Sequence, residues 1–369
     1  MFVFSADCCQ SLAAGGKFGV SVNEYRPKIN LRKSVFLIVL AIGLMALAVW
    51  VLARENLYQM LEVVGRANHS FIALAIAIYF LSVGIWAIRW RTTLSFVNYR
   101  TSFSTCYLII CATIFLNNIT PIVRFGGDPL GRVYMLHRLE NTSYSSGVAS
   151  VVGDRALIPL ILISFFMAGL VLQFGRGSLQ LSLILAVVWA LAALGTVFGP
   201  RLFFKKRIAV RGISSIINRV LGWFGKRRNV QEIAEGIETF YSDSYATIDK
   251  GKKLLVIGSL TLLMGVLDVF RLYTIFLALG YYPTFSMLLV ACSLPVVVGL
   301  IPFLPGGLVL VEGSLISIFA LFGVPLDLAM AATVIERGIS FFLIIIVGGG
   351  VFSYLGVRMA AKPEIQSGA

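Results

Sequence analysis

The sequence predicts an all-α integral membrane protein with about eight transmembrane helices. Of its 369 residues, 58% are hydrophobic and only 13% are charged, whereas about a quarter of the residues of a soluble domain carry a charge. The apolar runs are continuous over about 20 residues and do not alternate, so we expect helical spans and not barrel strands. Breaker-rich segments recur at matching places in the two halves. We therefore also expect broken or re-entrant segments and an internal repeat.

The net charge of +14 indicates membrane topology before it indicates a nucleic-acid partner, because basic residues gather on the cytoplasmic side of a membrane. The five cysteines form no C-x-x-C pattern and the chain has only two histidines. A structural zinc site or a disulfide framework is therefore not expected, and we predict no metal and no cofactor. Residues 1–30 lack the pattern of a signal peptide and are expected to form a polar tail.

The first predicted span, residues 34–53, follows a cluster of basic residues, which places the N-terminus in the cytoplasm. The second, residues 71–90, ends in a basic segment that carries Arg89, Arg91 and Arg100. We interpret these three arginines as a cytoplasmic flank, which agrees with the orientation of the first span.

The next stretch is irregular. Residues 103–116 are apolar but short for a crossing, and they lead directly into a segment rich in Asn, Pro and Gly. We interpret this region as a pair of half-helices; the alternative is a full span that ends in an ordinary loop. A long apolar run over residues 147–174 and a further span over residues 179–198 follow.

A basic loop separates the halves. Residues 201–253 contain twelve basic and five acidic side chains, and apolar residues recur at helical spacing near residues 213–224. This pattern is typical of an amphipathic helix on an anionic leaflet, so we expect the loop to be cytoplasmic and to lie on the membrane. A nucleic-acid site would also be basic, but the loop contains no base-reading module.

The second half is predicted to contain spans at residues 254–279, 285–300, 308–322 and 326–355. The short segment 308–322 either crosses or re-enters the membrane. Residues 358–369 form a tail that is expected to lie in the cytoplasm with the N-terminus. The whole of residues 31–357 is predicted to be one transmembrane domain.

The candidate site comes from two copies of one short pattern, separated by about half the chain. A proline stands four or five positions before a Gly-Gly pair, and an acid-arginine dipeptide follows the pair at nearly the same distance in both copies. The copies comprise Pro121, Gly126, Gly127, Asp154 and Arg155, and then Pro302, Gly306, Gly307, Glu336 and Arg337. Glycine lets backbone amides approach a ligand, and a broken helix favours an anion, so the Gly-Gly pairs could hold a lipid headgroup. An ordinary membrane loop would also contain Gly and Pro.

Ionisable residues inside apolar runs mark either a cavity or helix-locking salt bridges. Asp268 and Arg271 are three residues apart, for which a purely structural pair is at least as good an explanation. Adjacent residues of a helix point about 100° apart, so each acid-arginine dipeptide needs partners elsewhere. We predict pairing across the repeat, Asp154 with Arg337 and Arg155 with Glu336. An arginine released from such a pair could bind a phosphate.

These residues resemble a known family. Asn118 to Pro121, Gly126-Gly127-Asp128, Arg132 and Asp154-Arg155, with Pro305-Gly306-Gly307, Glu312 and Glu336-Arg337, are similar to the flippase-like membrane domain of lysylphosphatidylglycerol synthases. The resemblance covers residues 31–357 and implies movement of lipids between leaflets. Gly153-Asp154-Arg155 stands where the family commonly has Glu-Arg. No soluble transferase domain is expected before Ala369, so we expect no aminoacyl-transferase activity.

The sequence therefore predicts a multi-pass cell-membrane protein that moves an anionic or phosphate-bearing lipid, and not an enzyme, since nucleotide-binding and hydrolase motifs are absent. The alternatives are a non-translocating subunit of a lipid-modifying or glycosylation system and a structural scaffold. The expected partners are membrane lipids, with a second copy of the chain or a separate lipid-modifying enzyme as further possibilities. The predicted lipid-binding residues are Asn118, Pro121, Arg124, Gly126, Gly127, Asp128, Arg132, Asp154, Arg155, Pro305, Gly306, Gly307, Glu312, Glu336 and Arg337.

Overall fold

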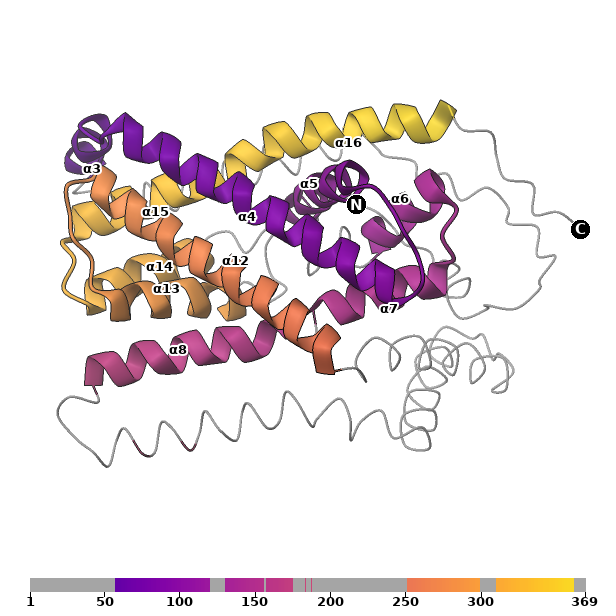
Figure 1. Ribbon diagram of the computed structural model, residues 1–369. Helices are drawn as coiled ribbons and strands as arrows, with labels where there is room; N and C mark the ends of the chain where they lie inside the picture. Colours follow the sequence, from indigo (N-terminus) through magenta and orange to yellow (C-terminus); the bar gives the residue numbers. More distant parts are fainter. Residues whose placement is uncertain are drawn as a thin grey trace, which may run out of the picture.

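The computed structural model describes residues 57–119, 130–155, 157–174, 183, 187, 251–298 and 310–361. Within these ranges the chain is helical and contains no strand (Figure 1). Four of the described stretches are long and apolar enough to cross a membrane: His69–Phe96, Ser146–Phe174, Leu255–Ala278 and Leu326–Ala361. The predicted all-helical fold is therefore confirmed for the described part. The number of crossings and the side on which the termini lie remain predictions.

The helices of the first half are α3 (Leu57–Gly65), α4 (His69–Phe96), α5 (Phe103–Ile119), α6 (Leu130–Glu140), α7 (Tyr144–Arg155) and α8 (Ile158–Phe174). Asn68 caps α4, because its side chain accepts a hydrogen bond from the backbone N–H of Ser70 at 2.9 Å. At 28 residues, α4 is about 42 Å long and exceeds the thickness of a hydrocarbon core.

The helices of the second half are α12 (Gly251–Ala278), α13 (Phe285–Val298), α14 (Leu310–Leu321), α15 (Leu326–Arg337), the π-helical turn η3 (Gly338–Leu343) and α16 (Ile344–Ala361). The turn η3 joins α15 to α16 without a loop, so the predicted long span 326–355 is a single interrupted helix. The predicted run 147–174 is likewise divided, between α7 and α8. Both interruptions directly follow an acid-arginine dipeptide.

The two halves repeat one helix pattern at a nearly constant offset of half the chain. The start of α4 corresponds to that of α12, and α5, α6 and α7 correspond to α13, α14 and α15. The backbone shows the same offset, because Asn98 (φ 59°) is as far from Gly280 (φ 72°) in sequence as Asn141 (φ 57°) is from Gly323 (φ 83°). We call this shared separation the repeat offset. Positive φ is uncommon outside glycine, so its recurrence at equivalent helix ends supports the predicted internal repeat.

The equivalent helices α4 and α12 pack together in antiparallel orientation across the front of the molecule (Figure 1). The backbone N–H of Asn68, at the start of α4, donates to the carbonyl of Ala278, at the end of α12, at 2.8 Å. At the opposite end, the Lys253 ammonium lies 4.4 Å from the ring centre of Phe96. Two equivalent helices that run in opposite directions are what an inverted repeat requires.

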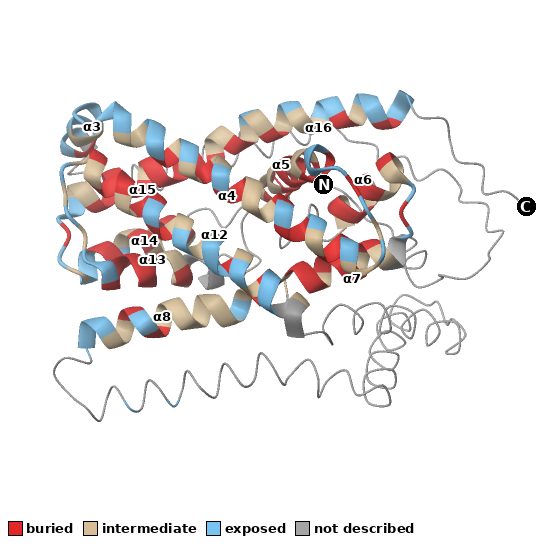
Figure 2. Ribbon diagram, in the orientation of Figure 1, coloured by how far each residue is buried: buried red, intermediate tan, exposed pale blue. Residues whose placement is uncertain are grey.

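The outer pairs repeat as well. Helix α5 packs on α16, and the equivalent helix α13 packs on α8. Figure 2 shows exposed residues along the outer side of α16 and buried residues on the side that faces the other helices. Large apolar side chains such as Leu263 and Phe270 of α12 and Ile346 of α16 are exposed. An apolar exterior of this kind suits contact with lipid.

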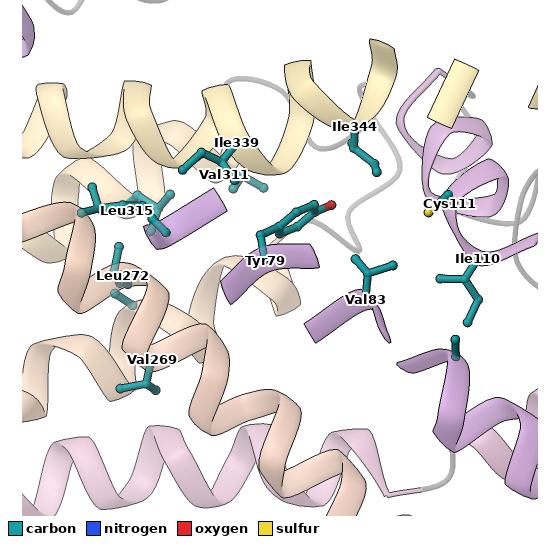
Figure 3. Close-up of a cluster of buried hydrophobic side chains, with 14 of the residues drawn as sticks. Tyr79, Val83, Ile110, Cys111, Val269, Leu272, Val311, Leu315, Ile339 and Ile344 are labelled. Carbon is teal, nitrogen blue, oxygen red and sulfur yellow. The ribbon is translucent and has the colours of Figure 1, made fainter. Parts of the chain in front are cut away.

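Apolar side chains from both halves fill the centre. Tyr79 of α4 lies among Leu272 of α12, Leu315 of α14 and Ile339 of η3 (Figure 3). On the other side of Val83, Cys111 of α5 and Ile344 of α16 continue the same cluster. The α4–α12 pair thus packs through one face on helices of both repeats.

Gly348 allows the closest approach of α16 to α5. A Cβ atom at this position would lie 2.6 Å from the carbonyl oxygen of Cys111 and 2.9 Å from the Cβ of Phe115. We expect Gly348→Ala to lower the free energy of unfolding by about 1–3 kcal/mol, because the helices must separate. Unfolding in a titration with SDS micelles measures this. Gly350→Ala is the matched control, since nothing lies within 4 Å of its Cβ position; an equal loss in both variants would contradict the prediction.

Several predicted elements lie outside the described residues, namely the spans 34–53 and 179–198, apart from residues 183 and 187, and the amphipathic segment of the basic loop. The segment predicted as two half-helices begins as one helix, α5, whose 17 residues reach only about 26 Å. Helix α14 has 12 residues. Both are shorter than a full crossing requires, so whether these segments cross or re-enter stays open.

Candidate functional site

The carboxylate of Asp154, at the end of α7, is fully buried and accepts hydrogen bonds from three side chains. Arg89 Nε donates to Oδ1 at 2.7 Å, whereas Arg132 Nη1 and Trp86 Nε1 donate to Oδ2 at 2.9 and 3.0 Å. Both arginines are buried as well. A charge inside an apolar bundle is tolerated when it is paired and hydrogen-bonded in this way.

Aromatic faces hold the arginines of this group. The Arg132 guanidinium lies 5.1 Å from the ring centre of Trp86 and 4.9 Å from that of Trp90. The Arg155 guanidinium lies 5.8 Å from the Trp86 ring on which it stacks. We call Trp86, Arg89, Arg132, Asp154 and Arg155 the Asp154 cluster. Its described members contain three guanidiniums and one carboxylate.

A second group lies at the end of α15. Arg271 Nη1 is 2.9 Å from Glu336 Oε1, and Arg271 Nη2 is 3.5 Å from Asp268 Oδ1. Beside it, Arg337 Nε donates to Glu312 Oε1 at 2.6 Å. We call Asp268, Arg271, Glu312, Glu336 and Arg337 the Glu336 cluster. The predicted contact between Asp268 and Arg271 is confirmed, but Arg271 also forms an ion pair with Glu336.

The two clusters are copies of each other. Arg89 and Arg271 are separated by the repeat offset, as are Asp154 and Glu336, so the ion pair Arg89–Asp154 recurs as Arg271–Glu336. The contact with the other repeat recurs too, because Arg89 Nη1 donates to Thr261 Oγ1 at 3.1 Å on α12. Its equivalent, Arg271, lies 5.3 Å from the ring centre of Tyr79 on α4. Tyr79 and Thr261 are themselves separated by the repeat offset.

The predicted pairing of Asp154 with Arg337 and of Arg155 with Glu336 is wrong. Each acid pairs instead with an arginine of the first long helix of its own repeat. The reason is that α7 packs on α4 and α15 packs on α12. Arg89 of α4 and Arg271 of α12 therefore lie within ion-pair distance of the two acids. The expectation that neighbouring acid and arginine need separate partners agrees with the structure.

The clusters lie at different levels of the bundle. Tyr79, which contacts the Glu336 cluster, and Arg89 are ten residues apart on α4, which corresponds to about 15 Å along the helix. Of the predicted site residues, the structure brings Arg132 together with Asp154, and Glu312 with Arg337.

Asn118 lies near the end of α5, and its amide Nδ2 is buried with no hydrogen-bond partner within the described part of the chain. Eight predicted residues lie outside the described ranges: Pro121, Arg124, Gly126, Gly127, Asp128, Pro305, Gly306 and Gly307. The proposed Gly-Gly headgroup site therefore stays a prediction, as does the approach of Gly127 to Gly307.

The sequence-based reasoning missed Arg89, Arg271 and the aromatic side chains around them. Arg89 was assigned to a cytoplasmic flank with Arg91 and Arg100, yet its side chain is 1% exposed, whereas Arg91 and Arg100 are exposed. The signal that could have identified Arg89 is its separation from Arg271, which equals that of Asp154 from Glu336. Among the described residues, no group of three or more His, Cys, Asp or Glu side chains could hold a metal ion.

Comparison with known proteins places this architecture among membrane proteins. The family model of the lysylphosphatidylglycerol synthase TM region matches residues 36–348. A UPF0104 membrane protein of Methanothermobacter thermautotrophicus is 33% identical over 79% of this chain and 85% of its own length. One from Pyrococcus horikoshii is 28% identical over 86% of this chain and 96% of its own length.

A glycosyltransferase of Haloferax volcanii, AglD, is 26% identical over 93% of this chain, which spans 58% of that enzyme. No solved structure matches the chain.

Proposed function

The chain belongs to the family of the lysylphosphatidylglycerol synthase TM region, and we propose that this multi-pass membrane protein moves an anionic, phosphate-bearing lipid between leaflets. The observation that carries the proposal is the buried Asp154 cluster, in which Arg89 and Arg132 share one carboxylate and Arg89 Nη2 has no hydrogen-bond partner in the described part of the chain. Its residues lie on α4, α6 and α7. Two of these helices belong to stretches long enough to span a membrane.

The arginines of this cluster are suited to a phosphate. A guanidinium presents a planar fork of N–H donors that matches phosphate oxygens. Arg89 Nη2 is buried and has no hydrogen-bond partner in the part of the chain that the structure describes. A buried donor without a partner is costly, so a bound phosphate oxygen would stabilise it.

The inverted repeat supports movement and not binding alone. In transporters built from inverted repeats, the two halves exchange conformations and expose a central site to each side in turn. Here the halves meet along α4 and α12, and each contributes an arginine that contacts the other half, Arg89 to Thr261 and Arg271 to Tyr79. A conformational change in one half therefore alters a contact made by an arginine in the cluster of the other half.

A second candidate function is supported by one comparison. AglD, which is named a glycosyltransferase, matches nearly the whole of this chain with part of its own length. A membrane domain that presents a phosphate-linked lipid to a glycosylation or lipid-modifying enzyme without moving it would need the same arginines. Only a transport measurement separates the two functions.

We expect vesicles containing the purified protein to move fluorescent phosphatidylglycerol from the inner to the outer leaflet, where a membrane-impermeant quencher removes its signal. Arg89→Gln should slow this movement about tenfold or more, because a charged hydrogen-bond partner of the phosphate is lost. Arg91→Gln is the matched control, since this exposed arginine of the same helix bonds to the Thr101 carbonyl.

A fluorescent lipid without a phosphate should not be moved. If the wild-type protein moves no lipid but still binds phosphatidylglycerol, the non-translocating function is favoured. Equal movement of charged and uncharged lipids would refute phosphate recognition.

A further inference from the structure

The two clusters differ at a position that supplies a hydrogen-bond donor to Asp154. Trp86 of the first half corresponds to Asp268 of the second at the repeat offset, so an N–H donor is replaced there by a carboxylate. The repeat offset pairs Arg132 with Ser314, and Glu312 lies two residues before Ser314, as the third residue of α14. The described members of the Glu336 cluster contain three carboxylates and two guanidiniums, whereas those of the Asp154 cluster contain one carboxylate and three guanidiniums.

Two buried carboxylate oxygens of the Glu336 cluster have no hydrogen-bond partner among the described residues. Asp154 Oδ2 accepts from Trp86 and Arg132, whereas Glu336 Oε2 has no such donor, although the Ser340 side chain lies near this carboxylate. The Oε2 of Glu312 is in the same condition, and Glu312 as a whole is 5% exposed. Glu336 Oε1 keeps its arginine, as Asp154 Oδ1 does.

One proton would correct both the charge and the hydrogen bonding. Glu312 has its own partner in Arg337, whereas Glu336 and the partly exposed Asp268 share the single guanidinium of Arg271. One negative charge is therefore in excess beside a buried ion pair, which is unfavourable. When one carboxyl group holds a proton, the cluster is neutral. That group also becomes an O–H donor, and a proton on Asp268 would stand in the position from which Trp86 donates to Asp154. The proton could then bridge to Glu336 Oε2.

We propose that the Glu336 cluster binds one exchangeable proton, shared between Asp268 and Glu336 beside the Arg271 guanidinium that both contact, and that this proton is the coupling ion for lipid movement. The coupling rests on the proposed function, but the proton site does not. A proton fits better than a metal ion, because among the described residues no three His, Cys, Asp or Glu side chains form a group that could hold a metal. Asp268 is the more accessible of the two carboxylates, since its side chain is 40% exposed and that of Glu336 is 11% exposed.

The charged or titratable groups that face Glu336 come from several elements. Arg271 and Asp268 lie on α12. Arg337 follows Glu336 in sequence on α15, and Glu312 on α14 pairs with Arg337. Tyr79 on α4 and Cys292 on α13 contribute neutral groups around Arg271. Protonation of a carboxyl in this set changes the electrostatic attraction between α12 and α15. Helix α12 in turn contacts the other repeat.

Infrared spectroscopy of the purified protein tests the proton site without any lipid assay. We expect a carboxylic-acid carbonyl band at neutral pH that shifts in D₂O. The band should disappear in Asp268→Asn and in Glu336→Gln alike, because each variant leaves one carboxylate for the Arg271 guanidinium. Glu62→Gln removes an exposed carboxylate and should leave the band unchanged.

Asp268→Asn is the variant that disturbs folding least, since this side chain is partly exposed and its contact with Arg271 is long. No band in the wild-type protein, or a band that persists in both variants, would overturn the proposal.

Vesicle transport tests the coupling. A pH gradient across the vesicle should accelerate movement of fluorescent phosphatidylglycerol several-fold in the wild-type protein and have no effect on Asp268→Asn. If lipid moves at one rate with and without the gradient, the coupling is wrong while lipid transport stands. If no lipid moves but the infrared band behaves as expected, the proposed function fails and the proton site stands.

Discussion

Asp154→Asn is expected to lower the free energy of unfolding by about 3–5 kcal/mol, the cost of removing one partner from a buried ion pair. The change removes the carboxylate to which both Arg89 and Arg132 donate. Arg89 and Arg132 are almost fully buried, so water cannot replace the lost acceptor. Unfolding of the purified variant in an SDS titration measures the effect.

Glu62→Gln provides the control for Asp154→Asn. Glu62 also pairs with an arginine, Arg66, but both side chains are exposed, and an exposed pair contributes only about 0–1 kcal/mol. Asp154→Glu keeps the charge and should recover part of the loss. If Asp154→Asn unfolds at the same SDS fraction as the wild-type protein, the buried cluster does not stabilise the fold.

The helices could be predicted from the sequence because an apolar run of sufficient length in a membrane has one stable backbone form. The predicted span 71–90 became α4, which is longer at both ends, and 254–279 became α12, which begins three residues earlier at Gly251 and ends at Ala278. The repeat was also visible, since Asp154-Arg155 and Glu336-Arg337 stand at matching places in the two halves. These features depend on local composition and on position along the chain.

The interruptions of the long helices were not predicted. Pro159 in the first turn of α8 is a signal for the first of them, because proline is tolerated at a helix start but not inside a helix. The second half has no proline there, and η3 replaces the break with a π-helical turn. Such turns recur at functional sites, but a single sequence gives no pattern that distinguishes them from a continuous helix.

The partners of the buried charges could not be predicted either, because they depend on which helices pack together. Arg89 is separated from Asp154 by 65 residues, and hydropathy treats it as the end of a span. Only the contact of α7 with α4 brings the two together. Pseudo-symmetry suggested ion pairs between the two repeats. In the structure, the equivalent ion pairs form within each repeat.

The pairing within the second repeat predicts a specific pattern of coupling. We expect Arg271→Gln to lower the free energy of unfolding by about 3–5 kcal/mol, because Asp268 and Glu336 both lose the guanidinium that they share. Adding Glu336→Gln removes one of the stranded charges. The double variant should therefore be more stable than the sum of the single changes predicts, with a coupling energy on the order of 1–3 kcal/mol.

The cycle of Arg155→Gln with Glu336→Gln is the matched comparison, since it tests the pair that the sequence suggested and the structure does not contain. Here we expect the two losses to add within about 0.5 kcal/mol, as for sites that share no partner. Unfolding in SDS of the four proteins in each cycle supplies the energies. Strong coupling of Arg155 with Glu336, together with additivity for Arg271 and Glu336, would mean that the charges pair across the repeats and that the arrangement within each repeat is wrong.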